Sequence, residues 1–97
     1  MKTKQEILNV LRKLKQDLFK KFKIREIWAF GSVMREEQHD NSDIDILVDF
    51  DDEADLFDLV GLGLFLEDKL GAKVDVVTKR SLRDGIRESV LKEIVPV

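Results

Sequence analysis

Two aspartates at the start of an apolar segment are the residues of this sequence best suited to chemistry. Asp43 and Asp45 flank the first residue of the segment 44–50. Successive side chains of a β-strand point to opposite faces, so both carboxylates would share one face, about 6.6 Å apart along the strand. Mg²⁺ prefers oxygen ligands and usually binds one or two carboxylates together with substrate phosphates. The pair therefore predicts a divalent-metal site, with the other strand face left to bury Ile44, Ile46, Val48 and Phe50.

A third aspartate repeats this arrangement farther along the chain. Asp75 lies between Val74 and Val76 in the apolar segment 73–77. In a strand, the two valines would face the core and the carboxylate would face away from it. We predict that Asp75 joins Asp43 and Asp45 as a functional carboxylate.

A phosphate-binding turn is predicted just before the aspartate pair. Gly31 lacks a Cβ, so an anion can approach its backbone closely. Ser32 can cap a short helical turn over 33–37, whose free N–H groups would attract phosphate. Arg35 can add a charge-assisted fork to the same phosphate. Phosphate cradle and metal carboxylates together are the apparatus for chemistry on a nucleoside triphosphate.

The elements that must position these residues follow from the periodicity of the apolar residues. A capping box of Thr3 and Glu6 begins the first helix, Ser81 and Asp84 suggest another, and Pro96 would end the last helix. We expect a single α/β (α+β) domain over 1–97, with a small mixed three-stranded sheet flanked by about four helices. The expected strands are 24–30, 44–49 and 73–77, and the longer helices are 4–21, 56–70 and 82–94.

The helix over 56–70 is the least ordinary of these elements. It is apolar around most of its circumference as far as residue 66, and such a helix needs burial on two sides. Gly61 and Gly63 weaken it by about 1 kcal/mol each relative to Ala, which suits a closely packed neighbour. We expect the 56–66 surface to contact a homodimer or hetero-oligomer partner, with Phe65 as a central contact. Burial in the core alone is the alternative, and Gly71 should end the helix.

Several other polar residues have plainer interpretations. The acidic stretch 49–55 lacks the glycine and closing glutamate of a calcium loop, so we interpret it as a solvated connection and helix N-terminus. Asp49 shares the strand face of Asp45, which leaves an outer-shell role open. His39 has no partner at ligand spacing and is interpreted as a surface-loop residue rather than a catalytic one. Lys79 and Arg80 are interpreted as surface charges, although they could reach phosphate.

Composition narrows the class of protein. The 97 residues are 43% hydrophobic and 38% charged, with a net charge of −3 and no cysteine. The acidic balance argues against long nucleic acid as a substrate. No apolar run is long enough to span a membrane. The absence of cysteine excludes disulfides and is typical of a cytoplasmic protein.

The pattern Gly-Ser, ten residues, Asp-x-Asp, followed by Asp75 in a later strand, resembles the nucleotidyltransferase superfamily of DNA polymerase β. Within it, the chain is most similar to the minimal nucleotidyltransferases of the MNT or MntA type, and the resemblance covers nearly the whole chain. One departure is Glu36, because members of the family often have glycine after the arginine.

The resemblance implies a site and an activity. Asp43 and Asp45 would bridge two Mg²⁺ ions, with Mn²⁺ as the alternative, and Asp75 would hold the ion that activates the acceptor. Gly31 and Ser32 would hold the β- and γ-phosphates of ATP. Family members of this type are antitoxins that transfer AMP to a tyrosine of a HEPN-domain ribonuclease toxin, as in type VII-like toxin–antitoxin pairs.

Two other functions stay open at this point. One is nucleotidyl transfer to a small-molecule acceptor, as in aminoglycoside nucleotidyltransferases. The other is a non-catalytic antitoxin that acts by binding alone. Retention of all three aspartates argues against the loss of catalysis.

Overall fold

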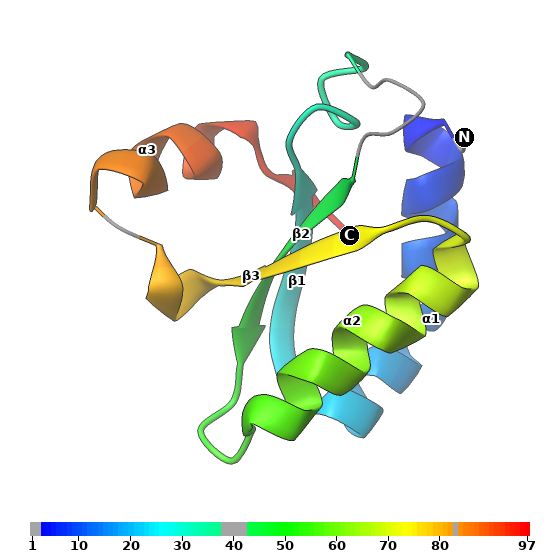
Figure 1. The fold of residues 1–97 in the computed structure, drawn as a ribbon, viewed down its shortest axis with the longest axis vertical. Helices are drawn as coiled ribbons and strands as arrows, with labels where there is room; N and C mark the ends of the chain where they lie inside the picture. Colours follow the sequence, from blue (N-terminus) through cyan, green and yellow to red (C-terminus); the bar gives the residue numbers. More distant parts are fainter. Residues whose placement is uncertain (1–2, 38–42, 83) are drawn as a thin grey trace.

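A four-stranded mixed sheet with helices on both sides forms the protein (Figure 1). The computed structural model describes residues 3–37, 43–82 and 84–97. The predicted surface-loop residue His39 lies outside them. Within these ranges the elements are, in chain order, α1 (Lys4–Phe22), β1 (Ile24–Phe30), β2 (Ile44–Phe50), α2 (Leu56–Leu70), β3 (Val74–Thr78), the 3₁₀ helix η1 (Lys79–Ser81), α3 (Asp84–Glu93) and β4 (Val95–Pro96).

The strand order is β3-β2-β1-β4. β1 runs antiparallel to β2 and to β4, whereas β2 and β3 are parallel. The predicted α/β class and mixed sheet are confirmed, but the sheet has a fourth strand that the apolar pattern did not predict. β4 has two residues, too few to show an alternation. Its Pro96 is tolerated because β4 lies at the edge of the sheet, where a ladder donor can be missing.

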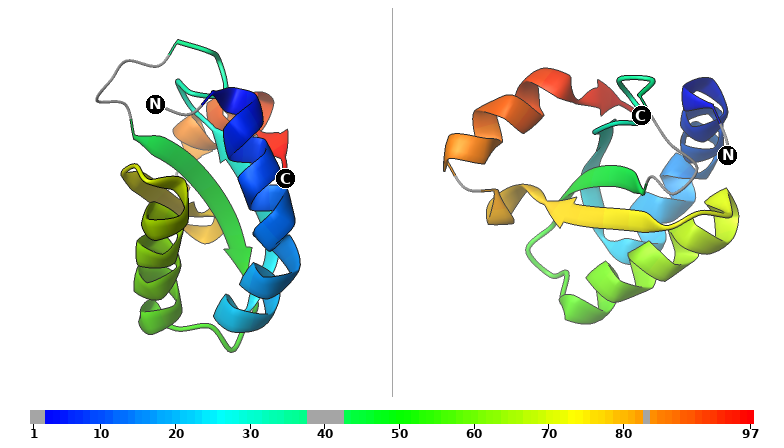
Figure 2. Two further views of the ribbon diagram at one scale, coloured as in Figure 1. Left: turned by 90° about the vertical axis from the view of Figure 1, so that its right-hand side faces the viewer. Right: turned by 45° about the horizontal axis from the view of Figure 1, so that its top comes forward.

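The two faces of the sheet differ in cover. α1 and α2 pack against one face (Figure 2). The inward residues of the central strands, such as Ala29, Ile46 and Val48, are buried there, and those of β3 are partly buried. The capping box of Thr3 and Glu6 that begins α1 is present. The opposite face carries Asp45 and Asp75 and lies toward η1 and α3. This face is the one available for chemistry.

The bounds of α2 agree with the predicted helix. Asp55 caps its N-terminus in a capping box with Asp58, and Gly71 ends it with a left-handed φ of 64°. The acidic stretch therefore connects a strand to a helix start, as predicted. Leu62 and Leu66 are fully buried, but the opposite side of the same helix is exposed, at Leu56 71%, Phe57 86%, Val60 53% and Leu64 63%.

Phe65 is a packing residue rather than a free surface residue. It lies against the buried core, and its ring centroid is 5.5 Å from that of Phe22. Gly61 of α2 faces the same ring, because a Cβ built there would lie 3.2 Å from Phe22 Cε1. The close neighbour expected at Gly61 is thus α1 of the same chain. Phe57 replaces Phe65 as the residue that tests the partner surface.

The C-terminal region departs from the predicted helix over 82–94. The backbone forms η1 and then α3, with Leu82 between them. Ser81 lies in η1 rather than directly before a helix that begins at Leu82. Its N–H donates to Thr78 Oγ1 at 3.2 Å and its hydroxyl donates to the Thr78 carbonyl at 2.9 Å. These two local bonds between Thr78 and Ser81, one to the Thr78 hydroxyl and one to its backbone carbonyl, tighten the chain into a 3₁₀ turn.

None of the helices within the described ranges has both the length and the apolar character needed to cross a membrane.

Candidate functional site

Three of the predicted site residues lie in a row across the sheet: Asp45 on β2, Asp75 on β3, and Gly31 directly after β1. Asp45 on β2 is paired in register with Asp75 on β3 and with Phe30 on β1. Gly31 follows Phe30 directly, and Asp43 lies just before β2, exposed to solvent. In-register neighbours on adjacent strands point to the same face, so Asp45 and Asp75 are side by side on the open face. The sheet therefore brings Asp75 close to Gly31 and Asp45, although it follows them by 44 and 30 positions in the chain.

Gly31 is required by its conformation and by its neighbour. Its φ is 81°, which residues with a Cβ rarely adopt. A Cβ built at Gly31 would overlap the Asp45 carboxylate. The sequence predicted that a phosphate would approach this glycine closely. In the structure, the anionic group that lies against Gly31 is the Asp45 carboxylate. Gly31 thus fixes where that carboxylate can lie.

A backbone turn follows Gly31, in place of the predicted short helix over 33–37. The N–H groups of residues 35, 36 and 37 donate to the carbonyls of Gly31, Val33 and Ser32 at 3.1, 3.1 and 2.9 Å. Among the described residues, no backbone acceptor pairs with the N–H groups of residues 32–34. Unpaired N–H groups that follow one another in a turn form an anion-binding concavity.

Glu36, the departure from the family pattern, adopts a left-handed φ of 61°. This conformation explains why glycine suits the position, since glycine has no Cβ to strain there.

The electrostatics of Asp45 reflect crowding of negative charge. Partial burial, then the Asp75 and Asp43 carboxylates, raise the pKa of Asp45 from its ordinary 3.8 to about 6, while Arg35 opposes the shift. Desolvation and like charges both disfavour the ionised form. The site would therefore gain from a bound cation.

The donor chemistry fits a hard divalent ion. Asp43, Asp45 and Asp75 offer oxygen ligands on adjacent elements, as Mg²⁺ prefers. The side chains of the described residues are not gathered into a group of three His, Cys, Asp or Glu ligands around one point. The predicted metal ligands thus have the right chemistry and the right strands, and ion binding would require their carboxylates to turn toward one another.

Arg35 is engaged in ion pairs. Its Nη1 lies 2.7 Å from Glu93 Oε2 of α3, and its Nε lies 3.2 Å from Glu37 Oε2. Hydrogen bonding to Glu37 and the charge of Glu93 raise the pKa of Arg35. A phosphate at the turn would compete with these carboxylates for the guanidinium. The pairing also ties the end of α3 to the turn beside Gly31.

A pocket of about 310 Å³ opens on the face that carries the two aspartates. Asp45 and Asp75 lie at one end of it, and α3 and the residues before it form the opposite wall. The sequence predicted the apolar residues that line this pocket only as parts of strand or helix faces. Periodicity shows which face of an element is apolar but not which other element that face will cover. The lining residues are Phe30, Asp45, Asp75, Val77, Ser81, Leu82, Ile86 and Val90.

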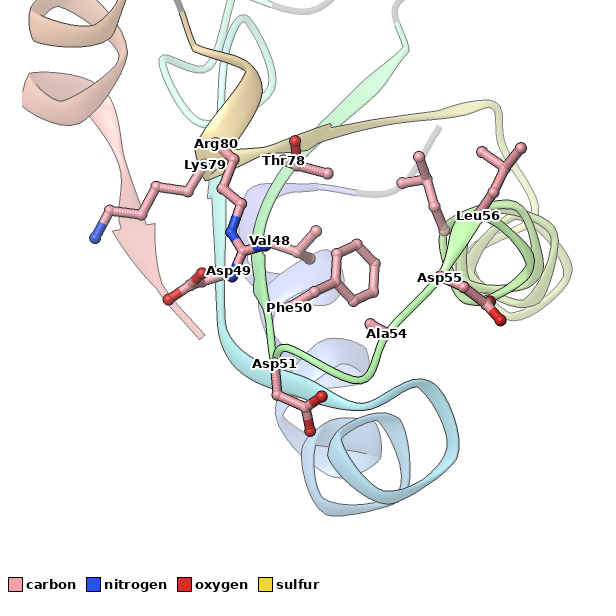
Figure 3. A pocket seen from close by; sticks show the side chains of 11 residues that line it. Val48, Asp49, Phe50, Asp51, Ala54, Asp55, Leu56, Thr78, Lys79 and Arg80 are labelled. Atoms are coloured by element: carbon pink, nitrogen blue, oxygen red, sulfur yellow. The ribbon is translucent and has the colours of Figure 1, made fainter.

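A second pocket, of about 300 Å³, lies at the other end of the strands (Figure 3). It is bordered by the ends of β2 and β3 and the start of α2. Asp49 lines it, about 13 Å farther along β2 than Asp45. This position argues against an outer-shell role for Asp49.

The two basic residues after β3 have surface roles. Arg80 Nη2 lies 2.8 Å from Asp52 Oδ1, and Lys79 Nζ lies 5.6 Å from the ring centroid of Trp28. Figure 3 shows the Lys79 side chain pointing away from the second pocket. Both were interpreted as surface charges, and the structure agrees with that interpretation.

A family model described as nucleotidyltransferase domain matches residues 11–97. The chain belongs to the nucleotidyltransferase family. A relative of this nucleotidyltransferase, the protein adenylyltransferase MntA of Thermococcus cleftensis, is 44% identical over 97 residues, covering 100% of this chain and 98% of that protein.

Solved structures place this nucleotidyltransferase with the minimal, MntA-type members, which confirms the resemblance. One structure assigned as a minimal nucleotidyltransferase matches with a TM-score of 0.82 and 38% identity over 95% of this chain and 94% of the other. A toxin–antitoxin structure with AMP-PNP matches at 0.71 and 30% identity, covering 87% and 69%. A Shewanella oneidensis complex of a tri-AMPylated HEPN toxin with an MNT antitoxin matches at 0.64 and 27%, covering 92% and 68%.

Proposed function

We propose that this protein transfers AMP from ATP to a hydroxyl group of a partner protein, with residues 1–97 acting as one domain. The observation that carries the proposal is the row formed by Gly31 directly after β1, Asp45 on β2 and Asp75 on β3. Asp43, Asp45 and Asp75 are the proposed catalytic and metal-binding carboxylates. Gly31, Ser32 and Arg35 are the proposed nucleotide-binding residues.

The row provides the axis that phosphoryl chemistry requires. Attacking and leaving oxygens lie roughly in line with phosphorus in such displacements. The turn after Gly31 would hold the β- and γ-phosphates at one end, with Asp45 beside the α-phosphate and Asp75 beside the acceptor hydroxyl. The acceptor oxygen forms a bond to the α-phosphorus, the bond to the bridging oxygen breaks, pyrophosphate leaves, and the hydroxyl proton passes to solvent.

The three aspartates would hold Mg²⁺, or Mn²⁺ in its place, which when bound neutralises phosphate charge and polarises the phosphoryl oxygens. The chain's own contribution is to fix the carboxylates on rigid strands. Gly31 sets the position of the Asp45 carboxylate by close contact. The Arg35 guanidinium would break its ion pairs with Glu37 and Glu93 and bind the triphosphate instead.

The proposed acceptor is a tyrosine of a cognate HEPN-domain toxin, which would make this protein the antitoxin of the pair. The similarity to an MNT antitoxin in complex with an AMPylated HEPN toxin supports this choice. The outer surface of α2 is the proposed contact with that partner. It offers four large apolar side chains in one helix, namely Leu56, Phe57, Val60 and Leu64.

Two other functions make different predictions. Transfer to a small-molecule acceptor would proceed without any protein partner. A binding-only antitoxin would neutralise its toxin even with the carboxylates removed. The retention of Asp45 and Asp75 in register on one face favours catalysis over both simple binding and a purely structural role.

The test mixes the purified protein, Mg²⁺ and ATP with a HEPN protein encoded beside it and records the intact mass of both chains. We expect one or more AMP units on the partner. The double variant Asp43→Asn with Asp45→Asn should form the same complex but add no AMP, because its metal ligands have lost their charge.

A stable complex without any adduct would replace the enzymatic account with the binding-only antitoxin. Full neutralisation of the toxin by the double variant would do the same. AMP found only on an added small molecule would favour the second acceptor class.

A further inference from the structure

The pocket beside Asp45 and Asp75 has no assigned occupant, and its walls are mainly apolar. Of the lining residues, Asp45 and Asp75 are charged and lie at one end, and Ser81 already donates its hydroxyl proton to the Thr78 carbonyl. The volume of about 310 Å³ is at the lower end of the range for small-molecule sites. This pocket suits a ligand group that packs against apolar walls along most of its length and reaches the two carboxylates at one end only.

The pocket extends in a different direction from the row of Gly31, Asp45 and Asp75, so it does not coincide with either end of the row. The row runs across the strands, from Gly31 through Asp45 to Asp75. The pocket instead extends along them, since Val77 lines it two residues beyond Asp75 on the same face. Leaving group and acceptor occupy the ends of an in-line displacement. The third large substituent of the α-phosphorus is the nucleoside, which must therefore extend away from the row at an angle to it.

Helix α3 forms one side of the pocket and could contact a nucleoside bound there. Ile86 lines the pocket yet is 55% exposed, whereas Val90 one turn later is buried and anchors the helix. Without nucleotide, the Arg35–Glu93 pair holds the end of α3 against the phosphate turn, and burial of Val90 would keep α3 in place once Arg35 turns to the triphosphate. A large side chain that borders a pocket and lacks cover would be buried by a ligand seated there.

We propose that this pocket is the nucleoside site, in which the base and ribose of the bound nucleotide pack between the sheet and Ile86 of α3. The inference deepens the proposed nucleotidyl transfer and rests on it. Ile86 is then a specificity-determining residue that contacts the nucleoside and not the phosphates.

The test compares two ligands that share their phosphates and differ in the nucleoside. Calorimetry measures the binding of ATP and of inorganic tripolyphosphate, each with Mg²⁺, to wild type, Ile86→Ser and Ile86→Trp. We expect Ile86→Ser to bind ATP about 10-fold more weakly, from lost apolar contact. Ile86→Trp, which fills the pocket, should lose at least as much. Neither should change tripolyphosphate binding. Ile86 is exposed, so both variants should fold.

Leu91→Ser is the matched control, because Leu91 is also an exposed apolar residue of α3 but does not line the pocket. It should bind both ligands like wild type. Unchanged ATP binding in both Ile86 variants would overturn the inference. If those variants then transferred AMP to the partner more slowly, the pocket would be a binding site for the acceptor group instead. An equal loss for both ligands would overturn it too. Wild type that binds neither ligand would remove the proposed function itself.

Discussion

At the scale of single residues, the site depends on the contact between Gly31 and Asp45. Gly31 combines a left-handed φ with a carboxylate where its Cβ would be. Gly71 has a similar φ of 64° but nothing within 4 Å of such a Cβ. The two glycines therefore separate backbone strain from crowding of the site.

We predict that Gly31→Ala destabilises the fold more than Gly71→Ala. Gly71→Ala should cost about 1 kcal/mol for the left-handed backbone alone. Gly31→Ala should cost about 1–2 kcal/mol more, because the new methyl group overlaps Asp45. Urea unfolding measures both. The excess should largely disappear when Gly31→Ala is combined with Asp45→Ala, and an excess that persists there would contradict the contact as its cause.

The charge of Asp45 makes a prediction about pH. Its pKa is raised to about 6 in the folded protein, so the folded state holds the proton more tightly than the unfolded chain does. Stability should then fall as pH rises from about 4 to about 6 and stay lowered above that range. Asp45→Asn should therefore raise the unfolding free energy at pH 8, by about 1–2 kcal/mol after allowing for the half-exposed carboxylate.

Thermal unfolding in metal-free buffer at pH 4 and pH 8 provides the measurement. The gain from Asp45→Asn should vanish at pH 4, where the wild-type carboxyl is protonated. An equal gain at both pH values would attribute the effect to packing instead of charge.

At the scale of elements, α2 serves two surfaces at once. Its inner side buries Leu62 and Leu66, and its outer side exposes Phe57 and Leu64. The burial of the inner side agrees with the core alternative, and the exposed outer side leaves the partner contact a prediction. The glycines of α2 belong to the inner packing.

We predict opposite outcomes for alanine at the two glycines of α2. Gly63→Ala should stabilise the fold by about 0.5–1 kcal/mol, because its Cβ would lie at an ordinary 3.8 Å from Val76 Cγ2. Gly61→Ala should gain little or lose stability, because its Cβ meets the ring of buried Phe22 at 3.2 Å. Chemical denaturation of both variants tests this, and equal gains would show that the Phe22 ring yields freely.

At the scale of the whole molecule, the proposed catalytic carboxylates and the proposed partner surface lie on opposite sides of one sheet. The carboxylates lie on the face toward α3, and the exposed apolar surface lies on α2 beyond the other face. β3 is the edge strand on this side of the sheet and carries Asp75. A partner that contacts α2 can therefore reach the acceptor side of the row around this edge.

We predict that Phe57→Glu weakens association with the partner at least 10-fold and leaves the isolated protein folded. Phe57 is 86% exposed, so its replacement should change stability by less than about 0.5 kcal/mol. Aromatic residues commonly dominate the energetics of interfaces. Calorimetric titration with the partner measures the change, and Leu91→Glu on α3 serves as the control. Unchanged affinity for Phe57→Glu would remove α2 from the interface.

The sequence by itself determined most of the fold, because its elements have strong local signals. The alternation around Asp45 and Asp75 gave their strands and faces, and caps at Thr3 and Gly71 gave the helix ends. The parts it missed have weak local signals. β4 is two residues long, and the split between η1 and α3 depends on bonds made by Thr78.

Tertiary structure alone decided how those parts meet. The pairing of Asp45 with Asp75 depends on strand register, which is set by packing of the whole sheet. The contact of Gly31 with the Asp45 carboxylate, the pairing of Arg35 with Glu93, and the place of Ile86 beside the two aspartates join distant positions. A periodic pattern specifies which face of an element is apolar, but only the assembled chain specifies what that face covers.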